Sequence, residues 1–246
     1  MTFDLTALRP ELRRFVTFGG RFGSVFDHPL HSQIGLESLA GEPSGHRASG
    51  LDCINDIVEE KTRLLDQARA ERDWNSFVFL HQRPYRIDAL AEVMEVERPS
   101  RLWPLVGDVW LDSAAPSDSE DLWEEVWSRA FTQSGKRRKT SLRVMSPAER
   151  RALDELPETI TVWRGCSREG AVDGFSWTLD REMAIWFAYR FGGRGDEPAI
   201  LAEVSVSKES VLAYFERRRE SEVVLWPWQC MGATWEMLPR KAQQAA

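Results

Sequence analysis

The spacing of apolar positions predicts a helical stretch in the first part of the chain. From Leu51 onward, Ile54, Val58, Leu65 and Ala68 recur at intervals of three, four and seven residues, with charged residues between them. This is the period of one face of an amphipathic helix. Before this stretch, a glycine-rich and phenylalanine-rich segment predicts short extended pieces and turns.

Further helices are predicted on both sides of an acidic, serine-rich loop at 112–121. Helices over 74–82 and 87–96 would end where Pro84 and Pro99 follow them. A stripe of Leu, Trp, Val and Phe over 122–131 predicts another helix, whose tryptophans we expect to be core residues. A Ser-Pro-x-Glu sequence at 146–149 is typical of a capped helix start, and this helix would end near residue 156.

Beyond Pro157 the pattern changes to short alternating runs rich in β-branched residues. Strands are predicted over the ranges 159–163, 199–206, 222–226 and 233–238. A helix is expected to start near Thr178 or Asp180, and a shorter one is predicted over 208–215. The fold class is therefore α+β, with a mainly helical region at 1–156 and a second region at 157–246, unless the two are interwoven in one domain.

Composition places the chain among ordinary globular proteins. Its 246 residues are 42% hydrophobic and 29% charged, with a formal net charge of −7. Bulk charge therefore argues against a polybasic nucleic-acid platform, and the basic run 136–139 is expected to be a solvated linker. The longest uncharged stretch near the C-terminus, 223–235, contains Pro227 and is too short to span a bilayer, so no membrane association is expected.

The cysteines and histidines give no pattern of a metal or disulfide site. The three cysteines are far apart, without a C-x-x-C pair, which favours a reducing, cytoplasmic setting. None of the four histidines is paired with a cysteine, so we expect no metal. The chain also lacks H-E-x-x-H, Walker A, G-x-G-x-x-G and G-x-S-x-G motifs.

Three motifs in the last 90 residues carry candidate chemistry. They are Val-Trp-Arg-Gly at 162–165, Gly-Phe-Ser-Trp-Thr at 174–178 and Arg-Glu-Ser-Glu at 219–222. In this order they resemble the R-S-E arrangement of the ADP-ribosyltransferase superfamily, in its arginine-type branch with a Glu-x-Glu pair. The resemblance covers about residues 158–226. It implies a split β-sheet core and the use of NAD as a substrate, with residues 1–156 helping to close over it.

The resemblance gives a role to each residue of the first two motifs. Arg164 would bind the NAD diphosphate, because a planar guanidinium matches phosphate oxygens. Gly165 would allow the nicotinamide to approach the backbone. Ser176 would orient the catalytic carboxylate and the ribose, and Thr178 would support the strand or cap the following helix.

The third motif supplies the catalytic carboxylates. Glu222 would hold the ribose 2′-hydroxyl and stabilise the oxocarbenium-like transition state. Glu220, two positions earlier and thus expected on the same strand face, would activate the acceptor. Just before this pair, Tyr214, Phe215 and Arg217 stand where the family has a substrate-recognition loop. Without the other two motifs, the acidic pair would be read as a solvated strand edge.

Three functions remain open from the sequence. The first is transfer of ADP-ribose to a macromolecule, either a protein arginine or a nucleic-acid base, and a toxin-like bacterial or phage effector would fit the family. The second is hydrolysis of NAD, with water as the acceptor. The third is a non-catalytic binding or regulatory protein in which the three motifs coincide by chance.

Overall fold

The computed structural model describes residues 4–20, 23–39, 49–113, 116–167, 171–191 and 198–239. These form two compact units, Met1–Val96 and Glu97–Ala246. Helices and antiparallel sheets occur together, which confirms the α+β class. Each unit is described by itself.

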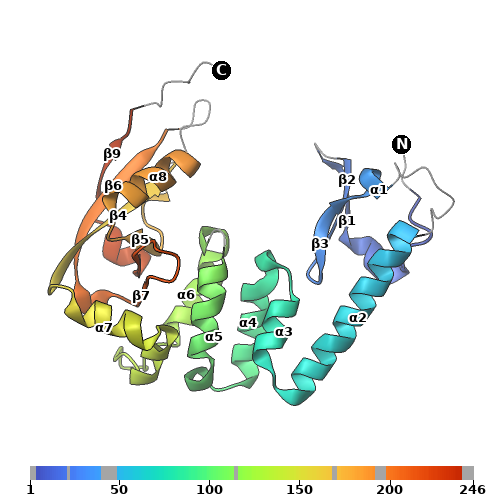
Figure 1. Cartoon of the computed structure of the whole chain (residues 1–246), viewed down its shortest axis with the longest axis horizontal. Helices are drawn as coiled ribbons and strands as arrows, with labels where there is room; N and C mark the ends of the chain where they lie inside the picture. Colours follow the sequence, from blue (N-terminus) through green and yellow to red (C-terminus); the bar gives the residue numbers. More distant parts are fainter. Residues whose placement is uncertain are drawn as a thin grey trace. The chain divides into compact units, whose positions relative to one another are not determined.

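The first unit combines a small antiparallel sheet with four helices (Figure 1). The sheet has the order β1-β2-β3. The elements are β1 (Val16–Gly20), β2 (Gly23–His28), β3 (His31–Gly35), α1 (Leu36–Leu39), α2 (Ser49–Glu71), α3 (Trp74–Leu80) and α4 (Arg86–Val96). The predicted helices at 51–68, 74–82 and 87–96 are confirmed within a few residues at their ends.

The core of the first unit forms where the apolar face of α2 meets the small sheet. Ile54 and Val58 of α2 are buried together with Phe26 of β2 and Leu36 of α1. The apolar stripe that predicted the helix is thus the face that the helix buries. Asp73 caps α3 by accepting a hydrogen bond from the backbone N–H of Ser76.

The second unit begins with three helices that precede its sheet. They are α5 (Pro99–Asp112), α6 (Glu120–Ser128) and α7 (Pro147–Glu155). Four tryptophans of α5 and α6 are at most 1% exposed and pack ring against ring: Trp103, Trp110, Trp123 and Trp127. The predicted capped start of α7 is confirmed, because Ser146 and Glu149 form a reciprocal capping box.

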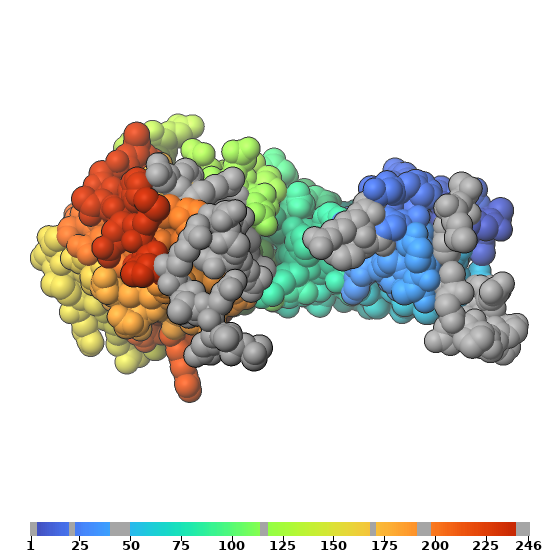
Figure 2. Space-filling model, turned by 90° about the horizontal axis from the view of Figure 1, so that it is seen from above, coloured from blue at the N-terminus to red at the C-terminus, as the bar shows by residue number. Residues whose placement is uncertain are grey.

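The sheet of the second unit has six antiparallel strands in the order β7-β8-β5-β4-β6-β9. Its strands are β4 (Thr159–Cys166), β5 (Ser176–Thr178), β6 (Ile200–Ser207), β7 (Ala213–Phe215), β8 (Glu222–Val224) and β9 (Thr234–Met237). Helix α8 (Arg181–Phe191) packs against β4, as Figure 1 shows. The edge strand β9 is exposed along its whole length, and Figure 2 shows the red end of the chain at the surface.

The pairing within this sheet is uneven. Strands β4 and β6 share eight aligned residue pairs, and β5 and β8 share three. In contrast, β4 and β5 are joined at a single pair, Trp163 with Thr178. The sheet therefore consists of two three-stranded halves, β7-β8-β5 and β4-β6-β9, that meet at one point.

The compact second unit starts at Glu97, whereas the sequence texture placed the change of region at residue 157. The reason is packing between α5 and the sheet. The ring of Trp110 lies edge-on to that of Phe175, just before β5, with centroids 6.3 Å apart. Helices that look like part of a helical region in the sequence thus share a core with the strands.

Two local predictions are wrong. No helix forms over 208–215, where a single 3₁₀ turn, Lys208–Ser210, is followed by the buried strand β7. Nor is the basic run 136–139 only a solvated linker. Arg137 donates from Nη1 to the Val211 carbonyl oxygen at 2.6 Å and from Nη2 to that of Leu212. Burial lowers the pKa of this guanidinium to about 10.

Candidate active site

Glu222 is the most unusual polar residue of the second unit. It begins β8, and its side chain is 5% exposed. Its Oε1 accepts hydrogen bonds from Ser176 Oγ at 2.5 Å and from Trp110 Nε1 at 3.1 Å. Its Oε2 is buried and has no hydrogen-bond partner among the described residues. A carboxylate that is satisfied on one oxygen only keeps acceptor capacity for a ligand.

The strand register explains why Ser176 reaches Glu222. Strands β5 and β8 are antiparallel, and Thr178 stands directly opposite Glu222. Ser176 lies two positions before Thr178, so it is the diagonal neighbour of Glu222 on the same face. The serine and glutamate motifs, which are 46 positions apart, are thus brought into direct contact.

The surroundings of Glu222 favour its protonated, neutral form more than water does. Burial raises the pKa of this carboxyl group, and the hydrogen bond from Ser176, the charge of Arg218 and the hydrogen bond from Trp110 oppose that rise. A buried carboxyl group with a raised pKa and identified partners is typical of functional sites.

Glu220 lies near Glu222 but is not on the strand as expected. It precedes β8, and the residues on both sides of it have positive φ, 57° at Arg219 and 44° at Ser221. The two carboxylates are brought together by Arg218 instead. Its Nε lies 3.3 Å from Glu220 Oε2, and its Nη2 lies 3.6 Å from Glu222 Oε2. The alternation argument for a shared strand face is therefore wrong, but both acids face one guanidinium.

Arg164 lies at the junction of the two sheet halves. From β4, its Nε donates to the Ala171 carbonyl oxygen at 2.8 Å, and its Nη1 donates to the Ser176 carbonyl oxygen at 2.6 Å. It has no ion pair with any residue that the structure describes, and burial lowers the pKa of its guanidinium. Arg164 therefore holds the turn before β5 and places a half-buried positive charge there that no described carboxylate pairs with.

Gly165 lies in close contact with helix α8 on the side where a side chain would project. A Cβ atom at this position would lie 2.0 Å from the Ala184 carbonyl oxygen and 2.3 Å from the Ala188 nitrogen, both in α8. The absence of a side chain lets α8 lie directly on β4. The approach of nicotinamide to the backbone of Gly165 stays a prediction.

Thr178 has the supporting role that the sequence predicted. Its Oγ1 donates to the Glu220 carbonyl oxygen at 2.6 Å and accepts from the Asp180 N–H at 2.9 Å. The threonine therefore ties the turn before β8 to the segment that leads into α8. Its side chain is 4% exposed, so this is a structural contact within the site.

The predicted recognition residues are placed differently from the expectation. Tyr214 and Phe215 form part of β7 and are only 4% and 1% exposed. Arg217 pairs with Asp108, Nη1 to Oδ1 at 2.7 Å, and with Glu149, Nε to Oε1 at 3.2 Å. The two rings are therefore core residues, and Arg217, whose side chain is 40% exposed, is the residue of the three that reaches the surface.

Two residues of the site were not predicted. Trp110 comes from α5, 112 positions before Glu222, and no local motif marks it. Arg218 stands within the Arg217–Arg219 run, which looks like an ordinary solvated stretch. The nearness of that run to the Glu-x-Glu pair was the only signal available in the sequence.

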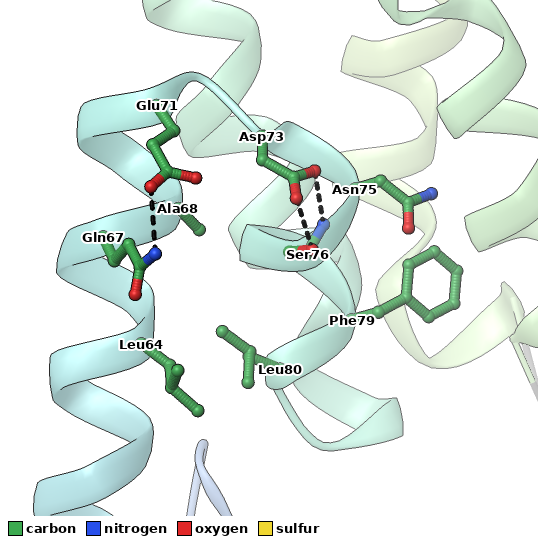
Figure 3. Close-up of a pocket in the computed structure, with 9 residues that line it drawn as sticks. All are labelled: Leu64, Gln67, Ala68, Glu71, Asp73, Asn75, Ser76, Phe79 and Leu80. Carbon is green, nitrogen blue, oxygen red and sulfur yellow. Dashed lines mark hydrogen bonds between the residues drawn. The ribbon is translucent and has the colours of Figure 1, made fainter.

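A separate groove lies in the first unit, between α2 and α3 (Figure 3). It has a volume of about 450 Å³ and an apolar lining that includes Leu64, Ala68 and Leu80. Four of its polar side chains bind one another in pairs: Asp73 accepts from Ser76, and Gln67 donates to Glu71. The groove therefore presents paired polar groups, unlike the carboxylate at Glu222.

No family model, curated protein or solved structure matches this chain. Among the described residues there is no group of three or more His, Cys, Asp or Glu that could hold a metal ion. In the same residues, no helix combines the length and the apolar composition needed to cross a membrane. The site is therefore interpreted from its own geometry.

Proposed function

We propose that the second unit cleaves NAD at its nicotinamide glycosidic bond and transfers ADP-ribose to a macromolecular acceptor. NAD supplies the bond that is cut and the group that is transferred. The observation that carries the proposal is the buried Glu222 carboxylate, which binds Ser176 through Oε1 and leaves Oε2 without a hydrogen-bond donor. The resemblance to ADP-ribosyltransferases assigned the same pair of residues to catalysis.

The free oxygen of Glu222 fits the ribose part of NAD. A ribose hydroxyl is a hydrogen-bond donor, and Oε2 is an acceptor that lacks one. Glycosidic cleavage develops positive charge on the sugar, which a nearby carboxylate stabilises strongly when water is excluded. Glu222 would thus hold the sugar and lower the barrier, while Ser176 and Trp110 fix its orientation.

The charge of Arg164 fits the diphosphate part. Arg164 is half-buried and has no carboxylate partner among the described residues, and such a guanidinium is stabilised by an anion nearby. Arg164 lies on β4, and Ser176 and Glu222 lie on the adjacent strands β5 and β8. NAD has an anionic diphosphate, which would bind Arg164, and a neutral ribose, which would bind Ser176 and Glu222.

The layout of the sheet also supports the proposal. The resemblance implied a split β core, and β4 and β5 are joined at one residue pair only. The first two motifs meet at that junction, and the third contacts the second from β8. The acceptor, a protein arginine or a nucleic-acid base, would be engaged by Glu220, whose side chain is 23% exposed compared with 5% for Glu222.

The test is nicotinamide release from NAD by the wild-type protein and by Glu222→Gln. We expect release that falls by about a thousandfold in the variant, which corresponds to about 4 kcal/mol of transition-state stabilisation. The matched control is Glu203→Gln. Glu203 also accepts a hydrogen bond from a tryptophan, Trp163, but it is exposed on β6, so its replacement should leave release unchanged.

Acceptor transfer is measured separately, with NAD labelled in its adenylate part and cell lysate. Label on protein or on nucleic acid identifies the acceptor class, whereas release without label identifies a hydrolase. Absence of release, together with an unchanged melting temperature, would favour a non-catalytic protein. NAD bound at about 100 times its Kd should add roughly 2.7 kcal/mol to the free energy of unfolding.

A further inference from the structure

Three consecutive arginines, 217 to 219, have three different environments. Arg217 is held by Asp108 and Glu149. Arg218 lies against Glu220 and Glu222. Arg219 is exposed and has no ion pair with any described residue. Only the middle guanidinium of this run therefore lies at the candidate catalytic carboxylate.

The backbone of the turn between β7 and β8 fixes Arg218 in this place. The Arg219 N–H donates to the Glu216 carbonyl oxygen at 2.7 Å, which closes the turn. The Ser221 carbonyl oxygen accepts from the Leu179 N–H at 3.0 Å. Arg219 and Ser221 also have positive φ, a conformation that costs a residue with a side chain about 1 kcal/mol or more. Such strain is found where the surrounding structure requires one geometry, and here that geometry presents Arg218.

Arg218 also lies between the buried carboxylate and solvent. Its side chain is 34% exposed, whereas that of Glu222 is 5% exposed. Its Nη2 is 3.6 Å from the same Oε2 that lacks a hydrogen-bond donor. A sugar held by this oxygen would thus lie close to the Arg218 guanidinium, a nitrogen acceptor that is also in contact with Glu220.

We propose that Arg218 is a self-modification site, to which the chain transfers ADP-ribose from NAD. This inference rests on the proposed function, because it requires NAD to be cleaved at Glu222. It adds that the first acceptor is within the chain itself. Modification would remove the Arg218 contact with Glu222 and place a bulky anionic group on the turn, so it would also limit further turnover.

The step balances with NAD as the only co-reactant. A bond forms between a terminal nitrogen of Arg218 and C1 of the nicotinamide ribose. The glycosidic bond from C1 to the nicotinamide nitrogen breaks, and nicotinamide leaves as a neutral molecule with the electron pair. The guanidinium nitrogen loses one proton, which Glu220 accepts and passes to solvent. The modified arginine keeps its positive charge, and no oxidant or reductant is needed.

The experiment incubates the purified full chain with NAD alone and maps the added ADP-ribose by fragmentation mass spectrometry, while nicotinamide release is measured in the same sample. We expect label on Arg218, no label on this turn in Arg218→Lys, and unchanged label on Arg218 in the control Arg219→Lys. Because the acceptor is tethered at the site, the rate constant for labelling should stay constant over about a tenfold range of protein concentration.

A measurement without NAD tests the placement of Arg218 independently. An arginine-specific dicarbonyl reagent should modify Arg219 several-fold faster than Arg218, because Arg218 is paired with two carboxylates. Replacement of one of them, in Glu220→Gln, should accelerate modification of Arg218 and leave Arg219 unchanged. Equal reactivity of the two arginines in the wild type would show that the pairing does not form, and it would overturn the inference.

The outcomes with NAD separate the two proposals. Nicotinamide release with label elsewhere, with no label, or with a labelling rate constant proportional to protein concentration overturns the inference and leaves the proposed function intact. Absence of release overturns both. Label on Arg218 that appears at constant rate and is lost in Glu222→Gln supports both.

Discussion

Glu149 and Glu222 are two glutamates of the second unit that are almost equally buried, at 3% and 4% exposed. Their carboxylates differ in how many of their oxygens accept a hydrogen bond. Glu149 accepts hydrogen bonds on both oxygens, from the backbone N–H of Ser146 to Oε2 and from the backbone N–H of Glu216 and Arg217 Nε to Oε1. Glu222 accepts on Oε1 only.

The difference appears in the direction of the two pKa shifts. Burial alone would raise the pKa of both groups. At Glu149, hydrogen bonds from Ser146 and Glu216 and the charge of Arg217 outweigh burial, so its pKa is lowered. At Glu222, burial outweighs the opposing contacts, and its pKa is raised. Glu149 therefore stabilises the fold in its charged form, whereas charging Glu222 costs stability.

This contrast distinguishes a carboxylate with structural partners on both oxygens from the one that we propose to be catalytic. Glu149 caps α7 and joins it to the turn after β7, where every partner belongs to the chain. Glu222 Oε2 has no hydrogen-bond donor among the described residues, and the Nη2 atom of Arg218 lies 3.6 Å from it. Sites that bind ligands commonly retain such a cost in stability.

The largest predicted effect is an opposite change in stability in two matched variants. Glu149→Gln should lower the free energy of unfolding of the second unit by about 3 kcal/mol, because a neutral amide replaces the charged acceptor of two backbone N–H groups and of Arg217 Nε, while Arg217 keeps its pair with Asp108. Glu222→Gln should raise it at neutral pH, because it removes a buried charge. Chemical denaturation of the purified proteins measures both changes.

The pH dependence of stability is the control for the variants Glu149→Gln and Glu222→Gln. The pKa of Glu222 is raised in the folded state, so its contribution to stability is present at low pH and is lost as pH rises through the folded pKa. The gain in Glu222→Gln should therefore disappear in acid. If Glu222→Gln destabilises the unit as much as Glu149→Gln does, Glu222 is a structural residue and the comparison fails.

His28 in the first unit is a buried base, and we expect it to destabilise the fold when it becomes protonated in acid. Burial lowers its pKa from 6.5 to about 4, and its Nδ1 accepts from the Leu30 N–H at 3.0 Å. Its contribution to stability is present above the unfolded pKa and is lost as pH falls from 6.5 through about 4, by up to about 3 kcal/mol.

Hydrogen exchange of peptides from β2, followed between neutral pH and acid, measures this loss at His28. In His28→Asn the amide oxygen can still accept from Leu30, but no charge can form. This variant should keep its protection in acid, after correction for the intrinsic pH dependence of exchange. Equal loss of protection in wild type and variant would mean that another group controls the acid response.

Most of the elements could be predicted because their signals are local. The apolar stripe of α2, the capped start of α7 and the β-branched runs of β4 and β6 each lie within one segment of sequence. The segment 208–215 could not be predicted in this way, because β7 is buried through pairing with β8 and not by alternation within itself. Helix α5 was not predicted either, although its apolar residues pack in the tryptophan core.

The candidate site was predictable only in part, because some of its residues are marked by local motifs and others reach the site only through tertiary packing. Arg164, Ser176 and Glu222 were found from the order of their motifs, and the structure brings Ser176 and Glu222 into contact. Trp110 and Arg218 reach Glu222 through tertiary packing and through an unusual turn, neither of which leaves a periodic signal. Close approach at Gly165 could be inferred, but the approaching group, α8, could not.

A smaller effect is predicted for Trp110→Phe, which removes the N–H donor to Glu222 and keeps a ring next to Trp123. Nicotinamide release should fall about tenfold, or about 1.4 kcal/mol, as expected for one hydrogen bond to a charged group. The pKa of Glu222 should rise further, so the pH dependence of release should move to higher pH. Trp163→Phe, which loses the bond to the exposed Glu203, is the control and should leave the pH dependence unchanged.

The smallest predicted effects come from two serines, one beside each glutamate. Ser146 Oγ accepts from the Glu149 N–H as the cap of α7, so Ser146→Ala should lower the free energy of unfolding by about 1 kcal/mol and leave nicotinamide release unchanged.

Ser176 Oγ donates to Glu222, so Ser176→Ala should lower release about fivefold. At neutral pH Ser176→Ala should also lower the free energy of unfolding by about 1 kcal/mol or more, because it removes a hydrogen-bond donor from a buried charged group. Denaturation and nicotinamide release, measured on the same two preparations, check both serines. A loss of release in Ser146→Ala equal to that in Ser176→Ala would mean that the two carboxylates are coupled through the turn between β7 and β8 and do not act separately.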